Sequence, residues 1–245
     1  MLRIDELAVV RGKGAHAHRV YLPQLRLRSG QVVAVTGESG CGKSTLLEAI
    51  GLLLRPEGVA RFELGDAARR VDIAALLNAD RQAGLADVRA RRLGFVLQNG
   101  GLLPYLTVRD NIRLPGQLLG ATPDQALLAR VITALKLEPL LAKYPSQLSF
   151  GERQRTAFAR AIAHRPELVL ADEPTAALDP VNARRLFSLF IDLVRQEGMM
   201  ALVVCHDRPL VQHFELACLM ARPDHDAADR ESLPAQAQRG THFVF

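Results

Sequence analysis

Nine consecutive residues near the N-terminus form one motif: Gly37, Glu38, Ser39, Gly40, Cys41, Gly42, Lys43, Ser44 and Thr45. The motif follows a short apolar run, residues 32–36, and precedes residues that favour a helix. Glycines in a strand-to-helix turn allow successive backbone N–H groups to converge on phosphate oxygens, and the N-terminus of the helix adds a favourable dipole. The alternative is a plain glycine-rich turn, but the whole motif in this context predicts a phosphate-binding loop.

Two side chains of this loop have specific expected contacts with a bound nucleotide. The ammonium group of Lys43 is expected to reach the β- and γ-phosphates, and the hydroxyl group of Ser44 is expected to hold Mg²⁺.

Two acids end a second apolar run, residues 168–171. Ligands of open α/β sheets bind at the carboxyl ends of strands, so Asp172 and Glu173 are expected to face the nucleotide. Neighbouring residues of a strand point in opposite directions, which favours separate roles. We expect Asp172 to join the Mg²⁺ shell and Glu173 to act as the general base toward water. The alternative is an acidic turn before Pro174.

A third apolar run, residues 201–205, ends at His206. A histidine in such a place is commonly an ordinary surface or core residue. At the carboxyl end of a sheet strand, however, His206 is expected to contact the γ-phosphate.

The apolar runs predict an α/β fold. None of the three runs alternates with polar residues, which suits strands of a parallel sheet that is covered on both faces. Residues 181–197 are expected to form a helix, with Asp179 as its cap and Pro180 as its first residue. Residues 124–141 also read as helix, and residues 99–164 contain no strong strand candidate. We therefore predict a helical subdomain at 99–164, inserted into an α/β core.

Bulk composition excludes several classes of protein. The longest apolar runs are far shorter than the roughly 18 residues of a membrane helix, and charged residues interrupt the N-terminus where a signal peptide would be apolar. We therefore expect a cytosolic protein that acts on membranes only through a partner. The net charge of +5 is scattered and aromatics make up 5% of the chain, so no nucleic-acid partner is expected. Three cysteines do not form a disulfide framework.

A further motif narrows the class of nucleotide-binding protein. Residues 148–155 read Leu-Ser-Phe-Gly-Glu-Arg-Gln-Arg and resemble the signature of ABC (ATP-binding cassette) proteins, commonly Leu-Ser-Gly-Gly-Gln. The serine at 149 and the glutamate at 152 also form a helix capping box, which is compatible with this interpretation. Gln98 matches the Q-loop of the family, residues 176–179 match its D-loop, and His206 matches its switch histidine.

The resemblance covers nearly the whole chain and implies a fold. That fold is a P-loop NTPase (RecA-like) core sheet flanked by helices, formed by residues 1–98 and 165–245, with an N-terminal antiparallel β region and an ABC helical subdomain at 99–164. The resemblance also implies ATP and Mg²⁺ as cofactors. Besides the loop at 37–45, it assigns nucleotide contacts to Gln98, Ser149, Gly151, Glu152 and Asp179. Its catalytic residues are Glu173, His206 and Lys43, and its metal ligands are Ser44, Gln98 and Asp172.

The family also implies two kinds of partner. A second copy of the cassette would pack head to tail so that Ser149 and Gly151 of one copy close over ATP on the other. A transmembrane permease subunit would place the chain at the inner face of the cell membrane. Residues 102–115 are similar to cassettes of the lipoprotein-release, macrolide-efflux and cell-division type. The alternatives are a soluble ABC ATPase that acts on cytosolic machinery and a P-loop kinase of small molecules.

The chain departs from the family pattern in three places. Phe150 replaces the first signature glycine, and Glu152 replaces glutamine. No aromatic residue precedes Tyr21, although the family stacks one on adenine, so Tyr21, Arg11 and a histidine remain candidates.

Within the phosphate loop, Cys41 is interpreted as a space-filling residue rather than a redox switch. The polar residues after 223 are expected to form a loop, followed by a short terminal strand at 241–245.

Overall fold

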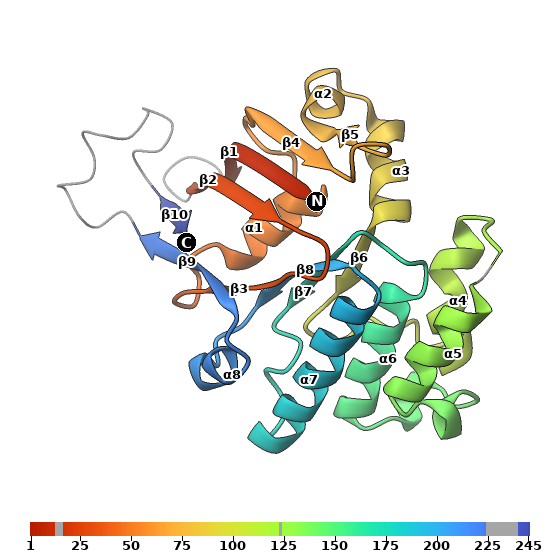
Figure 1. Cartoon of the computed structure of the whole chain (residues 1–245). Helices are drawn as coiled ribbons and strands as arrows, with labels where there is room; N and C mark the ends of the chain where they lie inside the picture. The colour runs from red at the N-terminus through yellow and green to blue at the C-terminus, as the bar shows by residue number, and fades with distance from the viewer. Residues whose placement is uncertain (13–16, 123, 224–239) are drawn as a thin grey trace.

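One mixed sheet runs through the molecule. The structure, a computed structural model, describes residues 1–12, 17–122, 124–223 and 240–245. The strands pair in the order β5-β4-β1-β2-β10-β9-β3-β8-β7-β6 (Figure 1). The strands are β1 (Leu2–Arg11), β2 (His18–Leu27), β3 (Val32–Thr36), β4 (Arg61–Leu64), β5 (Val71–Asp72), β6 (Leu93–Val96), β7 (Leu168–Asp172), β8 (Met200–Val204), β9 (Ala217–Pro223) and β10 (Thr241–Val244). The α-helices are α1 (Lys43–Ile50), α2 (Ile73–Asn78), α3 (Gln82–Arg92), α4 (Val108–Leu118), α5 (Gln125–Ala134), α6 (Phe150–Ile162), α7 (Pro180–Gln196) and α8 (Arg208–His213).

The parallel half of the sheet contains the three strands expected from the apolar runs. β3 pairs in parallel with β8 and β9, and β7 pairs in parallel with β8 and β6. Val33 and Val35 of β3 join the hydrophobic cluster around α1, whereas Val32 and Ala34 join the cluster around α6 and α7. Both faces of the strand are therefore buried, which explains why its sequence shows no polar alternation.

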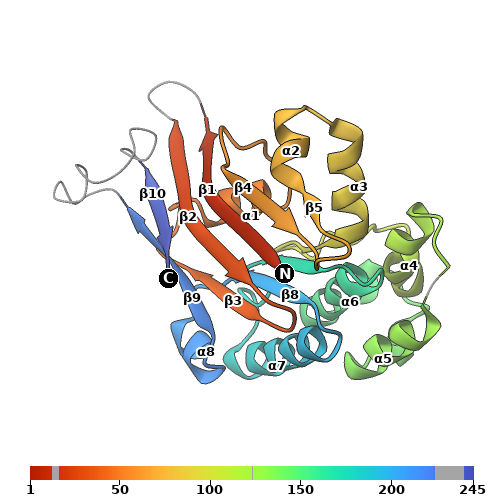
Figure 2. The same ribbon diagram turned by 45° about the horizontal axis from the view of Figure 1, so that its top comes forward.

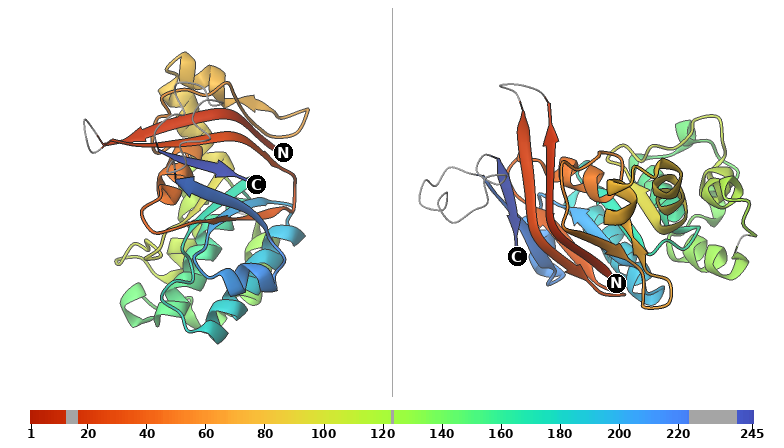
Figure 3. Two further views of the ribbon diagram at one scale, coloured as in Figure 1. Left: turned by 90° about the vertical axis from the view of Figure 1, so that its left-hand side faces the viewer. Right: turned by 90° about the horizontal axis from the view of Figure 1, so that it is seen from above.

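The antiparallel half of the sheet curls over α1. β1 pairs antiparallel with β2 and with β4. The antiparallel strands lie across α1 in the ribbon (Figures 2 and 3). Leu46 of α1 shares one hydrophobic cluster with Ile4 of β1 and Leu22 of β2. The first helix is thus enclosed between the two halves of the sheet. The expected α/β core and N-terminal antiparallel region are confirmed.

Residues 99–164 form helices and turns in the described part of the chain. The prediction of one helix over 124–141 is wrong in its length, because α5 ends at Ala134. Lys136 has a left-handed backbone with φ of 53°, which an α-helix cannot continue, and a 3₁₀ turn at Glu138–Leu140 contains Pro139.

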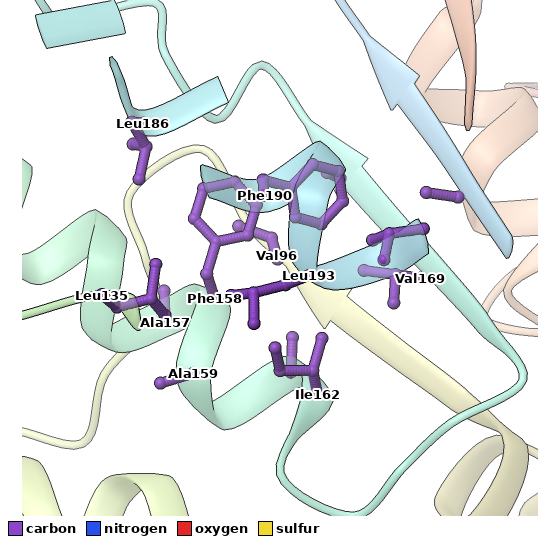
Figure 4. Packing of buried hydrophobic residues seen from close by; sticks show 14 of the residues in the cluster. Val96, Leu135, Ala157, Phe158, Ala159, Ile162, Val169, Leu186, Phe190 and Leu193 are labelled. Carbon is purple, nitrogen blue, oxygen red and sulfur yellow. The ribbon is translucent and has the colours of Figure 1, made fainter. Parts of the chain in front are cut away.

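The core beneath the sheet fixes the two helices that carry the later motifs. Phe158 of α6 and Phe190 of α7 lie with their ring centroids 4.5 Å apart, surrounded by further apolar residues (Figure 4). Because both helices are anchored here, the positions of their N-termini at Ser149 and Asp179 are determined by the packing of the core.

The end of the chain adds a strand to the sheet. The expected terminal strand is confirmed as β10, which lies between β2 and β9. The loop predicted after residue 223 falls at 224–239, outside the described residues. None of the described helices has the length and apolar character needed to cross a bilayer.

Candidate functional site

The phosphate loop connects β3 to α1, as the motif predicts. Gly42 caps α1 with a left-handed backbone, φ 93°. A Cβ at this position would lie 2.5 Å from Val20 Cγ2, and a Cβ at Gly37 would lie 2.6 Å from Ala221 Cβ. Side chains at both positions would collide with neighbouring strands, so the close approach of the loop to the sheet requires glycine.

Lys43 lies inside this loop and is only 4% exposed. Its Nζ donates hydrogen bonds to Gly37 O at 3.1 Å and to Glu38 O at 2.5 Å. Neutral carbonyl groups stabilise a buried ammonium less than an anion does. The loop therefore holds an ammonium group that has only neutral hydrogen-bond partners, at a place where phosphate oxygens could bind.

Asp172 ends β7 beside the first turn of α1. Burial raises the pKa of its carboxyl group, and a hydrogen bond with Ser44 lowers the pKa in part. Its Oδ1 atom is buried and has no hydrogen-bond partner within the described chain. An unpartnered carboxylate oxygen beside a hydroxyl group fits a hard cation such as Mg²⁺, which uses few protein ligands together with phosphate oxygens. No cluster of three acidic, histidine or cysteine side chains suited to a metal occurs among the described residues.

Glu173 meets two of the predicted site residues. His206 Nε2 lies 2.6 Å from Glu173 Oε1, and Gln98 Nε2 donates to Glu173 Oε2 at 3.3 Å. The backbone of Glu173 is left-handed, φ 46°, and its N–H donates to Val204 O of β8. The turn directs this carboxylate toward residues that follow β6 and β8. Three residues far apart in the sequence are thereby brought together.

The signature residues form the N-terminus of α6. Ser149 Oγ accepts a hydrogen bond from the Glu152 N–H at 3.3 Å, and the Ser149 N–H donates to Glu152 Oε2 at 2.7 Å. This reciprocal capping box lowers the pKa of Glu152, chiefly through the backbone hydrogen bond from Ser149. The carboxylate of Glu152 is therefore used to hold the helix end.

Ser149 and Gly151 lie apart from the phosphate loop. They line a cleft of about 860 Å³ together with Arg155 of α6, residues of α7 and nearby loops, and no residue of 37–45 lines it. A separate pocket of about 340 Å³ contains Glu173 and His206, and Leu178 is common to the walls of both. One chain therefore does not bring the signature residues and the phosphate loop into a single pocket.

Asp179 caps α7 as predicted. Its Oδ1 accepts hydrogen bonds from the backbone N–H groups of Val181 and Asn182, each at 3.1 Å. The hydrogen bond from the Asn182 backbone is the main reason that the pKa of Asp179 is lowered. Asp179 is exposed at the helix end, where it can meet another molecule.

Among the candidates for stacking on adenine, Tyr21 is unsuitable. It is 8% exposed, it packs edge-on to His242 with ring centroids 5.5 Å apart, and burial raises its pKa. Arg11 is exposed and forms an ion pair with Glu48 of α1 at 2.9 Å. His18 lies beside the phosphate loop, whereas His16 falls outside the described residues.

Sequence reasoning missed two residues that hold the loop after β6. Gln154 Nε2 donates to Gln98 O, and the guanidinium of Arg160 donates to Gly100 O and Gly101 O. Gln154 could have been found from the sequence, because its helical spacing with Ala157 places a polar residue on the apolar face of α6.

Alkylation of Cys41 is expected to weaken ATP binding by at least about 100-fold, because the adduct occupies the loop. Cys41 Sγ is 3.6 Å from Lys43 Nζ, and the residue is 8% exposed. Titration calorimetry with ATP on fully labelled protein measures the effect. Cys41→Ser protein treated with the same reagent, which still carries Cys205 and Cys218, is the control and should bind ATP. Unchanged affinity after complete labelling of Cys41 would show that the thiol does not border the nucleotide.

Comparisons with known proteins place the chain in one family. The family model described as "ABC transporter" matches residues 23–176. The chain is 45% identical over 195 residues to the lipoprotein-releasing system ATP-binding protein LolD of Novosphingobium aromaticivorans, covering 78% of this chain and 82% of the relative. It is 36% identical to the methionine import ATP-binding protein MetN of Streptomyces coelicolor, covering 87% of this chain and 61% of the relative.

Solved structures resemble the chain over most of its length. A dimeric structure of MJ0796, described as a bacterial ABC transporter cassette, superposes with a TM-score of 0.73 at 28% identity, covering 90% of this chain and 94% of that one. A dimeric structure of a post-hydrolysis state of MJ0796, bound to ADP and Pi, has a TM-score of 0.68 at the same identity and coverage.

Proposed function

Since the chain belongs to the ABC transporter family, as one of its ATP-hydrolysing subunits, we propose that two copies clamp ATP between them and drive a separate transmembrane subunit. The single observation that carries this proposal is the separation of the signature residues from the phosphate loop. Ser149 and Gly151 line one cleft, whereas Glu173 and His206 lie in another. A complete site therefore requires the signature residues of a second copy.

The nucleotide is proposed to bind first through its phosphates. The backbone of residues 37–45 and the buried ammonium of Lys43 would contact the phosphate oxygens, because the loop gathers N–H donors and one cation at the start of α1. Exchanging neutral carbonyl partners for an anion gives Lys43 a stronger partner than it has in the loop alone.

Mg²⁺ is proposed to be held by Ser44, Asp172 and Gln98. The buried, unpartnered Oδ1 of Asp172 and its hydrogen bond with Ser44 support this assignment. When bound, Mg²⁺ would neutralise charge on the phosphates as the terminal bond breaks.

Glu173 is proposed to be the general base for the attacking water. Its carboxylate accepts a hydrogen bond from Gln98, and His206 lies at hydrogen-bond distance from its other oxygen. His206 is thereby held at the end of β8, where it can contact the γ-phosphate. Positioning a carboxylate in this way typically accelerates proton transfer by about 10²- to 10⁴-fold.

The second copy is proposed to supply Ser149, Gly151, Glu152 and Asp179. The first three residues form the N-terminus of α6, and Asp179 forms that of α7. A helix N-terminus is a favourable place for phosphate. Phe150 is half-buried and lies beneath the Arg153 guanidinium, so this replacement of the signature glycine packs on its own helix.

Gly151→Asp is expected to weaken ATP-dependent dimerisation without destabilising the fold. A Cβ at Gly151 meets only Leu178 Cδ2 at 3.5 Å, an ordinary contact, and an acid in the first turn of a helix stabilises it by about 0.3–1 kcal/mol. The same acid would repel the triphosphate of the other copy and weaken ATP-dependent dimerisation by at least about 100-fold. Thermal unfolding and analytical ultracentrifugation, both in the Glu173→Gln background, measure the two effects.

A matched control adds an acid to another helix start. Gln125→Asp changes the first, exposed residue of α5 and should leave dimerisation unchanged. If Gly151→Asp also left it unchanged, α6 would not face the nucleotide of the second copy.

The membrane subunit is proposed to bind in a groove beside the loop that follows β6. This groove of about 350 Å³ lies between α3, α4 and α6, and Leu118 at its edge is 79% exposed. A short helix with an apolar face is the occupant that fits best, and the resemblance to LolD favours a membrane subunit of the lipoprotein-releasing type. The chain would then lie at the inner face of the membrane. The lining residues are Arg89, Ala90, Leu93, Phe95, Leu103, Leu114, Pro115, Leu118, Leu119, Arg160, Ala161 and His164.

Purification of the full chain from its native cells, with identification of the proteins that co-purify, tests the proposed function. A stable complex with ATP-hydrolysing activity supports the transporter subunit. A complex with cytosolic proteins alone would favour the soluble ABC ATPase, and transfer of phosphate to an acceptor other than water would favour the kinase.

A further inference from the structure

Two side chains of α6 hold the loop that follows β6. The Arg160 guanidinium donates one hydrogen bond to Gly101 O at 2.7 Å and another to Gly100 O at 2.9 Å. Earlier in the same helix, Gln154 Nε2 donates to Gln98 O at 2.5 Å. The backbone of residues 98–101 is therefore attached to the helix at three carbonyl groups.

One of these attachments uses a polar side chain on the buried face of α6, where an apolar residue would pack more favourably. Gln154 is 0% exposed, and its Oε1 atom has no hydrogen-bond partner within the described chain. Partial burial lowers the pKa of Arg160, and none of the ion pairs among the described residues includes it. The neighbouring residues on this face of α6, Ala157 and Phe158, are apolar and fully buried. Packing alone does not account for a buried amide and a partly buried guanidinium group here.

One residue of this loop, Gln98, contacts the proposed base Glu173. Gln98, whose carbonyl group is bound by Gln154, donates through its own side chain to Glu173 Oε2 at 3.3 Å. The backbone position of Gln98 therefore sets where its amide meets the carboxylate. Arg160 also lines the groove beside α4, so it touches both that groove and the loop.

We propose that Arg160 and Gln154 are positioning residues for hydrolysis, which fix the loop at 98–101 so that Gln98 orients Glu173. This inference rests on the proposed role of Glu173.

Arg160→Met tests the proposal in the full chain without any partner. We expect kcat for ATP hydrolysis to fall by about 10-fold or more, because a small displacement of a positioning group lowers the rate steeply. KM for ATP should stay within about twofold, since Arg160 does not face the phosphate loop. In nucleotide-free protein, hydrogen exchange of the amides at 97–103 should quicken locally. Gln154→Leu should produce the same pattern, whereas Arg160→Lys, which retains a donor, should recover part of the loss in kcat.

Arg26→Met is the matched control, because Arg26 also donates to backbone carbonyl groups, Ile4 O at 2.9 Å and Leu25 O at 3.1 Å, in the antiparallel part of the sheet. It should leave kcat and exchange at 97–103 unchanged. In the Gln98→Ala background, Arg160→Met should lower kcat no further, because the two residues act through one route.

Two results would overturn the proposal. One is a loss of kcat that simply adds to that of Gln98→Ala, and the other is unchanged exchange at 97–103 in Arg160→Met. If instead the unaltered chain bound ATP without hydrolysing it, the proposed function itself would fail, and the exchange result would still report on the loop.

Discussion

Glu173→Gln is expected to lower the rate of ATP hydrolysis by about 10²- to 10⁴-fold while leaving ATP affinity nearly unchanged. The amide is isosteric with the carboxylate, but it cannot accept a proton from water. It can also keep at least one of the two contacts that Glu173 makes with Gln98 and His206. The affinity should persist because the phosphates contact residues 37–45 rather than this carboxylate.

The same variant should accumulate as an ATP-dependent dimer, because hydrolysis no longer opens it. Phosphate release and analytical ultracentrifugation at saturating Mg-ATP measure the two properties. Glu57→Gln, which changes an exposed carboxylate paired with Arg19, is the control and should retain the full rate. Unchanged turnover in Glu173→Gln would remove Glu173 from the role of base, and a persistent monomer would contradict the clamp.

Lys43→Met is expected to weaken ATP binding by about 100-fold or more, because removing one partner of a desolvated, hydrogen-bonded charge pair costs about 2–5 kcal/mol. Methionine has a similar length and suits the 4% exposed site, so the fold should remain as stable as before. Titration calorimetry with ATP and with inorganic tripolyphosphate measures the change.

Both ligands should lose affinity to the same extent if Lys43 contacts only the phosphates. Lys143→Met, at an exposed lysine, should alter neither affinity. Loss of ATP affinity with unchanged tripolyphosphate affinity would place Lys43 beside the base or ribose instead.

Much of the fold was predictable because its signals are local. The run 32–36 became β3 with both faces buried, and Asp179 followed by Pro180 marked the start of α7. Family membership followed from the order of the motifs and is confirmed by the comparisons. The break of the helix at Lys136 was missed. Its left-handed backbone is adopted by a residue other than glycine, so neither a glycine nor a change in the spacing of apolar residues marks the break in the sequence.

The site was predictable as a set of residues, but its contacts were not. Gln98, Glu173 and His206 were expected near the nucleotide, yet their mutual hydrogen bonds depend on the pairing of β6, β7 and β8. The contact of Gln154 with the carbonyl group of Gln98 joins residues 56 positions apart. Such pairs are set by tertiary packing, which single-sequence periodicity does not describe. The burial of Tyr21 against His242, which excludes it as an adenine platform, depends on the last strand of the chain.

The left-handed backbone at Glu173 has a consequence for how this protein could be made more heat-resistant. A residue with a Cβ in that conformation costs the folded state roughly 1–2 kcal/mol, and glycine would remove the cost. Engineering that selects for melting temperature alone would therefore favour loss of the carboxylate at this turn. Stabilising changes should be sought elsewhere, because here thermal tolerance and turnover oppose each other.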